Sequence, residues 1–414
     1  MISKGLAWFQ KLKIGWSEWG MILLFILPPA GIAVLLLSGW LHLYRVVKRR
    51  KPFELKIETF FFLSLFLASV LASIQFHKWT YFASPALILG YFGFYLYTKQ
   101  HGSLSSFRHW IWITIGGGLY VAVLGFIQMT THTAYSTGGV FSFLTGTRLF
   151  GYDQPDRLFG SAYNPNFASF LLLYALALLL MVLLHQMHGT GRRVHVLLIT
   201  CIFIVSTAII ETGSRTGFAC MAMLLLLFFF RFRWKIGAFL IIVFAVCSQE
   251  LIQWLPRTTY LGESMDTRKI IWETSIRIWE KYPCFGVTMQ GFQDMYQNFT
   301  GEYIAHPHNI FLAFFVIYGT LGGMAFLLLL AVLLYQLTAL LVSCHTHKEF
   351  FEMFLFLFPV TLLTGLFDYP MFSPQTALLA VGLLGQWGYY LRTCSFALDS
   401  KKVGALRLLR KKNS

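Results

Sequence analysis

The chain has 414 residues, of which 57% are hydrophobic and only 12% are charged. A soluble globular protein carries about 25% charged residues, so this composition excludes that class. The formal net charge is +16, yet most Lys and Arg residues lie in short segments between apolar runs, where they orient a membrane protein, and nucleic-acid binding is therefore not expected.

Long apolar runs recur along the whole chain, and each can cross a hydrocarbon core of roughly 30 Å. They predict an all-α polytopic membrane protein with about eleven transmembrane helices, in a range of about 10–12. We expect Pro28-Pro29 to kink the first span. The long stretch 309–342 is either one tilted helix or a short helix that enters a longer one near Gly319. The predicted spans are 20–44, 57–76, 81–98, 110–130, 167–185, 196–213, 216–230, 236–249, 309–342, 349–366 and 375–391.

The distribution of basic residues predicts the orientation of these spans. Alternate segments, beginning with 45–56 and ending with 392–414, hold 21 of the 33 Lys and Arg residues, so the charge rule places them in the cytoplasm. The long segments 131–166 and 250–305 then lie outside, and so does the N-terminus, although it is itself basic. Loops of this length on a helical scaffold are where a functional site is expected.

Arg215 lies between two apolar runs, at the predicted outer boundary of the membrane. A charge at this position is costly unless it is paired or solvated, so Arg215 is a candidate functional residue. The alternative is a structural ion pair with Glu211, which lies one helical turn away. The glycines on both sides of Arg215 allow a close backbone approach, as an anion site requires.

The segment Met265–Lys281 predicts an amphipathic helix within the second exterior loop. Arg268 leads its apolar stripe, whereas Arg277 points in the opposite direction. A straight helix cannot direct both arginines at one ligand, so we expect Arg268 to bind the ligand and Arg277 to be solvated. The rest of the stripe is Ile271, Trp272, Ile276, Ile278 and Trp279, and the opposite face also holds Glu273, Glu280 and Lys281.

Two histidines, His306 and His308, lie in the sequence His-Pro-His-Asn at the mouth of the span 309–342. No acidic or Cys ligand accompanies them locally, and the six cysteines of the chain form no close pair, so the sequence predicts no metal site and no disulfide framework. The pKa of histidine lies near ambient pH, which suits proton transfer. The alternative is a hydrogen-bonded histidine at the membrane interface.

Two further segments contribute candidate binding residues. Arg157 precedes Asn164-Pro165-Asn166, which predicts a turn followed by a helix start whose N–H groups either bind an anion or sugar or simply form a cap. Asp368, outside the tenth span, is a candidate of the same kind.

Together, two arginines and one or two histidines are predicted to gather on the outer face. Guanidinium groups suit phosphate, so the set predicts an anionic, phosphorylated, lipid-linked substrate. No chain of Asp and Glu residues runs through the predicted spans, which argues against an ion-coupled transporter.

One spacing is similar to a known signature. His308-Asn309, nine residues, Gly319, two residues and Gly322 resemble the H-[NSQ]-x9-G-x-x-G signature of the bacterial O-antigen ligase and polymerase superfamily. Gly323 stands where ligases often have Ser or Thr. This departure affects the choice between a ligase and a polymerase, and it does not affect the resemblance to the superfamily.

The Arg157–Asn166 segment, the Ser-Arg215-Thr-Gly element and the helix with Arg268 occur in the same order as in that superfamily. The resemblance covers residues 110–390, and residues 1–109 fit only in hydropathy. It implies a GT-C-like membrane protein with N-terminal helices (1–109), an O-antigen ligase-like catalytic region that includes the partly helical loop 250–305 (110–391), and a basic cytoplasmic tail (392–414).

The resemblance also implies an activity. Such enzymes transfer a glycan from undecaprenyl diphosphate to an acceptor hydroxyl at the outer face of the bacterial cytoplasmic membrane, without a metal, nucleotide or other cofactor. Arg215 and Arg268 would hold the leaving diphosphate, and His308 would be the catalytic base. The implied substrate-binding residues are Arg157, Asn164, Asn166, His306, Asn309 and Asp368.

The acceptor is left open by the sequence. A lipid acceptor would make the protein a ligase, a glycan acceptor would make it a surface-polysaccharide polymerase, and a protein acceptor is a third alternative. The alternative from another class is a non-enzymatic flippase or exporter of lipid-linked saccharide. That function needs charges along a path through the membrane, whereas the predicted charges lie at one face.

Overall fold

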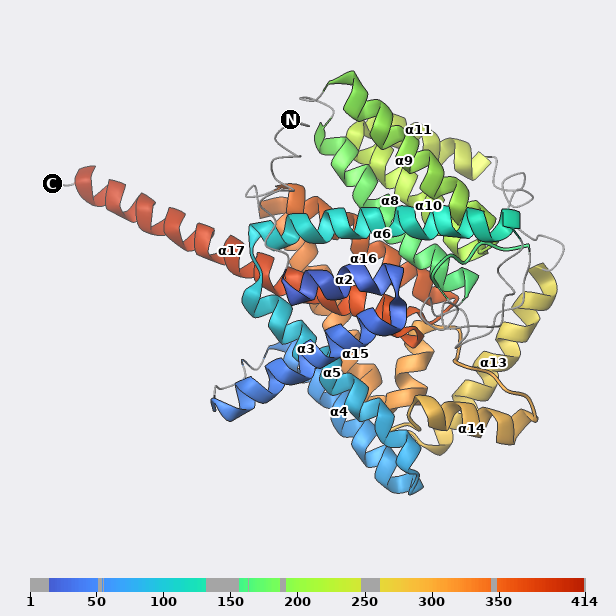
Figure 1. Ribbon diagram of the computed structural model, residues 1–414. Coiled ribbons are helices and arrows are strands. Elements are labelled where there is room, and N and C mark those ends of the chain that lie inside the picture. The colour runs from blue at the N-terminus through green and yellow to red at the C-terminus, as the bar shows by residue number, and fades with distance from the viewer. Residues whose placement is uncertain are drawn as a thin grey trace.

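The computed structural model describes residues 15–50, 54, 56–131, 156–162, 164–186, 191–246, 261–343 and 348–412. All regular elements in these ranges are helical, which confirms the all-α prediction (Figure 1). In chain order they are α2 (Trp16–Ile26), α3 (Pro28–Lys48), α4 (Ile57–Phe76), η1 (Trp79–Phe82), α5 (Ala83–His101), α6 (Leu104–Thr131), α8 (Pro165–Gln186), α9 (Arg192–Glu211), α10 (Arg215–Phe232), α11 (Trp234–Val246), α13 (Leu261–Lys281), α14 (Met289–Thr300), α15 (Ile310–Ser343), α16 (Lys348–Leu366), η4 (Pro370–Phe372) and α17 (Pro374–Lys412).

Eight of the described helices are long and apolar enough to cross a membrane: α3, α4, α6, α8, α9, α10, α15 and α16. The predicted spans 81–98, 236–249 and 375–391 are helical as well, in α5, α11 and α17, but α11 has only 13 residues and none of the three belongs to that set. Helix α8 is apolar around its whole circumference, and 94% of its central window is buried. It is therefore the centre of the bundle, with α6, α9, α10 and α16 packed around it.

The first predicted span, 20–44, is wrong as a single kinked helix. The chain leaves helical geometry at Leu27, and α2 packs back against α3, so that the α-carbon of Gly31 faces the backbone of Leu24. Pro28 starts the new helix because its missing N–H is not needed at a first helical position. The prolines thus separate two antiparallel helices.

This reversal also determines where α2 begins. Glu18, at the start of α2, lies 3.8 Å from His109 in the second turn of α6. Helix α2 therefore begins on the face where the basic segments 45–56 and 99–109 lie, which we call the basic face, whereas the sequence predicted the segment before residue 20 on the opposite face. The N-terminus itself, residues 1–14, lies outside the described residues.

Helix α15 is broken at Gly319, which has φ 65° and ψ −172°, a conformation that is essentially restricted to glycine. The rings of Phe314 and Phe326 stack at a centroid distance of 4.1 Å, whereas twelve residues of straight helix would rise about 18 Å. The two halves of α15 therefore fold against each other. The prediction of a short helix joined to a longer one near Gly319 is confirmed, and the tilted single helix is wrong.

The connection between α13 and α14 packs on this break and satisfies its backbone groups. The N–H of Thr320 donates to the carbonyl of Pro283 at 2.7 Å, and the N–H of Val287 donates to the carbonyl of Val316 at 3.1 Å. These bonds replace the helical bonds that the break removes. The start of α15 is thereby fixed relative to α13.

Helices α13 and α14 form the partly helical loop that the sequence predicts. Helix α13 begins at Leu261, four residues before the predicted start, and buries Ile271 and Ile278. Ile276 was predicted on the same stripe but is 41% exposed, because it lies at the edge of the stripe. On α14, Asp294 accepts hydrogen bonds from Lys78 Nζ at 2.6 Å and Tyr81 Oη at 2.7 Å, which attach the loop to η1 and its flank.

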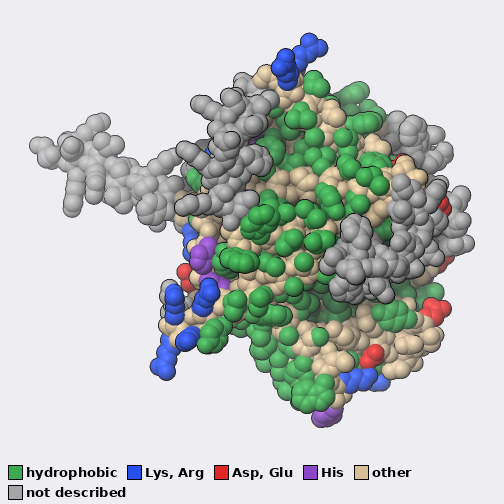
Figure 2. Space-filling view, in the orientation of Figure 1, with side chains coloured by type: hydrophobic (Ala, Val, Ile, Leu, Met, Phe, Trp, Pro, Cys, Tyr) green, Lys and Arg blue, Asp and Glu red, His purple; other side chains and the backbone are tan. Residues whose placement is uncertain are grey.

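The surface agrees with a membrane protein. Figure 2 shows hydrophobic side chains across the middle of the molecule, Lys and Arg side chains at the left edge near the end of α3, and acidic side chains at the right edge, where α13 and α14 lie. Helix α17 continues to Lys412, so the tail predicted at 392–414 extends the last helix and projects to the left in Figure 1.

Candidate active site

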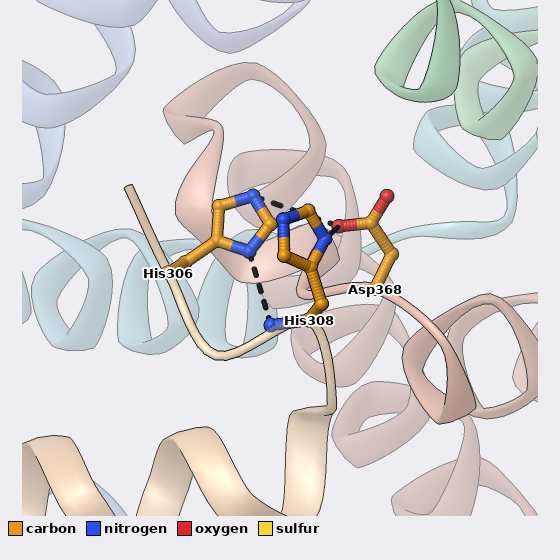
Figure 3. Close-up of side chains that lie close together, drawn as sticks. All are labelled: His306, His308 and Asp368. Atoms are coloured by element: carbon orange, nitrogen blue, oxygen red, sulfur yellow. Dashed lines mark hydrogen bonds and ion pairs between the residues drawn. The ribbon is translucent and has the colours of Figure 1, made fainter. Parts of the chain in front are cut away.

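Three segments far apart in sequence, 157–166, 306–308 and the residues after α16, meet at the face opposite the basic face. His306 and His308 precede α15, Asp368 follows α16, Asn166 lies in the first turn of α8, and Arg157 lies in the segment before α8. The close-up shows the two imidazole rings beside the Asp368 carboxylate (Figure 3). The sequence predicted all five residues as candidates, and the structure brings them together.

Asp368 is the centre of this cluster. Its Oδ1 lies 3.3 Å from His308 Nδ1 and 3.6 Å from His306 Nε2. Its Oδ2 accepts a hydrogen bond of 3.0 Å from the amide nitrogen of Asn166, and Oδ1 also accepts 2.8 Å from the N–H of Tyr369. Burial opposes the ionisation of Asp368, but the contact with His308, the charges of both histidines and the Tyr369 N–H together hold the pKa of this carboxyl well below its usual range.

The two histidines differ in environment. His306 is buried against the ring of Phe372, at a centroid distance of 4.7 Å, and its Nδ1 accepts a long hydrogen bond of 3.4 Å from the N–H of His308. Burial and the nearby His308 and Arg268 lower the pKa of His306 to about 3, although Asp368 opposes this shift. His306 is therefore neutral at physiological pH, with its proton on the Nε2 that faces Asp368. His308 is 27% exposed in its side chain, so it alone of the pair presents a ring to the outside.

A chain of donors fixes the far side of the carboxylate. Arg157 is buried; its Nε donates to the carbonyl of Thr212 at 2.6 Å, and its Nη2 donates to Asn166 Oδ1 at 2.9 Å. A guanidinium is only a donor, so Asn166 must present its oxygen to Arg157 and its amide nitrogen to Asp368. Arg157 and Asn166 were predicted to bind substrate. In the structure their contacts hold Asp368 in place, which was not predicted.

Arg268 lies near this cluster, as its helical face predicted. It is half-buried, and burial lowers its pKa while the charge of Asp368 raises it in part. Arg277 is exposed on the other face of α13. The structure thus agrees with the predicted difference in position between the two arginines.

The other predicted residues lie at helix starts. Arg215 is the first residue of α10, half-buried, three residues after the Thr212 carbonyl that Arg157 binds. Asn164 Oδ1 accepts from the N–H of Asn166 at 2.8 Å, which is the capping role considered as its alternative. Asn309 Oδ1 caps α15 through the N–H of Leu312 at 3.0 Å, and its amide donates to the carbonyl of Leu366 at 3.0 Å. This contact ties the start of α15 to the end of α16, just before Asp368.

The central position of Asp368 was not predicted. No metal site was expected because no acidic residue lies near the histidines in sequence, yet ligand atoms of His306, His308 and Asp368 lie within 4.8 Å of one another in the structure. The segment Phe-Asp-Tyr-Pro gave no signal of this, because the meeting depends on how α15 and α16 pack.

Comparison with known families matches residues 199–327 to O-antigen ligase. The matched segment runs from α9 into the second half of α15 and contains Arg215, Arg268, His306 and His308, whereas Asp368 lies beyond it. Comparison with curated proteins returned no match. The resemblance found in the sequence is thus confirmed over residues 199–327, and the match supports O-antigen ligase-type glycan transfer in general.

Proposed function

We propose that the protein transfers a glycan from a polyprenyl diphosphate, undecaprenyl diphosphate in a bacterial cell membrane, to an acceptor hydroxyl, and that the site lies at the outer face of that membrane. The observation that supports this most is the half-exposed His308 held against the buried Asp368 carboxylate, with Arg268 close by. A base can take the proton of a hydroxyl nucleophile, and a nearby cation can stabilise an anionic leaving group.

In the proposed reaction His308 is the general base. Its Nδ1 faces Asp368, so the proton of a neutral imidazole rests on Nδ1 and Nε2 accepts the proton of the acceptor hydroxyl. The acceptor oxygen forms a bond to the anomeric carbon as the bond from that carbon to the diphosphate oxygen breaks. Arg268 and Arg215 stabilise the charge that collects on the leaving diphosphate. Asp368 stabilises the imidazolium that forms, and it does not touch the sugar.

We also propose that the reaction needs no metal, although three potential ligands are close together. His306 Nδ1 accepts a backbone N–H, so Nε2 carries the proton and has no lone pair for a metal. Asp368 already accepts bonds from Asn166 and Tyr369. A dication would also be repelled by Arg268.

The test is transfer in vitro with the purified full chain, a polyprenyl diphosphate-linked glycan and a candidate acceptor. Product formation that is lost in His308→Ala, with donor binding retained, supports the proposal, because the base acts on the acceptor and not on the donor. A flippase would instead move the donor across vesicle membranes without forming product, and His308→Ala would leave that movement intact. Supplying a lipid, glycan or protein acceptor separately distinguishes ligase, polymerase and protein-modifying activity.

A further inference from the structure

A polar cavity lies at the basic-face ends of α4, α5, α15 and α17, far along the chain from the residues of the candidate active site. It has about 930 Å³ of space not filled by protein atoms, which includes its opening to solvent, and its polar lining residues are Lys56, Glu58, Lys99, Gln336 and Arg392. None of these residues takes part in the proposed transfer. Lys56, Lys99 and Arg392 lie at the basic face and the candidate active site lies at the opposite face, so this cavity needs an explanation of its own.

Three cations converge in this cavity. The amino groups of Lys56 and Lys99 lie 3.4 and 3.8 Å from Glu54 Oε2, and an Arg392 guanidinium nitrogen lies 3.5 Å from the same oxygen. Lys99 is only 3% exposed, and its Nζ donates to Tyr95 Oη at 2.9 Å. Glu54 itself is 57% exposed in its side chain. The three cations thus surround a point where an anionic oxygen is stabilised. The Glu54 carboxylate is exposed, so it can move from this point into the solvent.

The cavity also contains an acceptor with an unmet requirement. Glu58 is 3% exposed, and its Oε2 has no hydrogen-bond partner within the part of the chain that the structure describes. A buried carboxylate oxygen without a donor is costly. A ligand with both an anionic oxygen and a hydrogen-bond donor therefore matches this lining better than a bare anion does.

A second, apolar cavity lies about one helical turn from the polar one, and it has about 840 Å³ of space that includes its opening to solvent. Three helices line both cavities. On each of them, a residue of the polar cavity lies about one turn from a residue of the apolar cavity, on the same face, because residues three or four apart are neighbours on a helix. The residue pairs are Glu58 and Phe62 on α4, Gln336 and Leu333 on α15, and Gly388 and Leu384 on α17. The far end of the apolar cavity reaches Ile310 and Met371, close in sequence to His308 and Asp368. The combined space is amphipathic, with its charged end at the basic face.

We propose that this space binds one phospholipid from the leaflet at the basic face. The phosphate would take the point now held by Glu54 Oε2, between Lys56, Lys99 and Arg392. A donor of the headgroup would meet Glu58 Oε2, and an acyl chain would lie in the apolar cavity toward the candidate active site. The polyprenyl chain of a glycan donor fits less well, because its diphosphate would be at the Arg268 end, and the three cations at the opposite end would be left without a ligand.

The test measures lipid binding and so does not depend on the proposed transfer reaction. The purified full chain is delipidated in detergent, and the binding of phosphatidylethanolamine, phosphatidylglycerol and phosphatidylcholine is followed by native mass spectrometry. Ethanolamine and glycerol headgroups carry a donor, and choline carries none. We expect one tight site for the first two lipids and weaker binding of phosphatidylcholine.

The variant Lys56→Gln/Arg392→Gln changes two half-exposed side chains and is expected to fold, with thermal unfolding as the check. It should weaken the tight site roughly three- to tenfold, since half-exposed ion pairs contribute little individually. Lys48→Gln is the matched control, because Lys48 is an exposed cation on the same face outside the cavity. An equal loss in this control would show general charge attraction and overturn the proposal.

Three other results would also overturn it. Equal binding of phosphatidylcholine would remove the role of Glu58. If inorganic phosphate binds the site as tightly as the lipids do, the acyl chain contributes nothing to binding. Displacement of bound phospholipid by polyprenyl phosphate, with affinity unchanged in Lys56→Gln/Arg392→Gln, would assign the apolar cavity to the tail of the donor.

Discussion

The substitution Asp368→Asn tests the chain of contacts that runs from Arg157 through Asn166 and Asp368 to His308. Asn166 can offer Asp368 only its amide nitrogen, because its oxygen is held by Arg157. An asparagine at position 368 therefore places its NH2 against another donor in either orientation, since one side meets the amide of Asn166 and the other meets the N–H of Tyr369 and the Nε2 proton of His306. Asparagine also carries no charge to stabilise an imidazolium at His308, and where its NH2 faces Nδ1 the ring proton moves to Nε2, which then cannot accept the proton of the acceptor hydroxyl.

The expected loss follows from the geometry. A general base contributes about 10²–10⁴-fold, and the 3.3 Å contact between Asp368 and His308 is longer than a strong charge-assisted bond. We therefore expect transfer to fall roughly 10²–10³-fold, or about 3–4 kcal/mol. The measurement is the initial rate of transfer in vitro at saturating donor, with donor binding and thermal unfolding measured for each variant. Donor binding should change little, because Asp368 does not touch the donor.

A second substitution makes the argument refutable. In Asp368→Asn/Asn166→Asp, the new carboxylate accepts from Arg157 and from the new amide, so the amide oxygen turns back to the histidines. Transfer should recover at least tenfold over Asp368→Asn, although not fully, because the charge beside His308 is lost. If the double variant is no better than the single variant while both fold, the orientation of the chain does not control His308 and the reasoning is wrong.

Three further predictions concern individual side chains or glycines, and a fourth concerns metal. Arg268→Lys should lower transfer at least tenfold, since an ammonium lacks the forked contact with phosphate, whereas Arg277→Ala should be mild; equal damage at equal expression would mean that the wrong arginine was chosen. His306 has a pKa lowered to about 3, so the unfolded chain takes up its proton first and stability is lost as pH falls below about 6.5, by up to about 1.4 kcal/mol per pH unit; His306→Asn should flatten this part of the pH profile of thermal unfolding. Gly319→Ala should cost more than about 2 kcal/mol, because its Cβ would meet a carbonyl oxygen, whereas Gly301→Ala, also at positive φ but in open space, should cost only about 1 kcal/mol in the same denaturation assay. Transfer should persist in EDTA, and restoration by a divalent ion after a loss would show that a metal is required.

Much of the membrane scaffold could be predicted, because apolar length and charge act locally along the chain. The predicted span 57–76 agrees with α4, and the other long spans agree with their helices to within a few residues at most ends. The α2–α3 reversal could not be predicted in this way, since a continuous apolar run has the same hydropathy whether it crosses once or folds back at Leu27. The wrong side predicted for the start of α2 follows from that one error.

The candidate site could likewise be predicted only in part. The cost of a charge at a membrane boundary, or on the apolar face of a helix, is visible in sequence, and it singled out Arg215 and Arg268. A contact between residues on different helices is not visible, and the central role of Asp368 depends on such contacts with His308 and Asn166. The histidines therefore looked unaccompanied in sequence, although a carboxylate lies beside them in space.

The spacing of the family signature has a mechanical explanation in the structure. Asn309 caps α15 and binds the carbonyl of Leu366, which holds His308 beside the segment that carries Asp368. The short first half of α15 ends at Gly319, where an added Cβ would lie within 2.5 Å of the α13–α14 connection. Gly322 then lies against Tyr318, so the second half of the helix can fold close to the first. Because α13 and its connection pack on this break, the nine-residue interval sets the height of Arg268 relative to His308. The motif thus relates the position of His308, just before α15, to that of Arg268 on α13, which explains why the glycines belong to the same signature as the histidine.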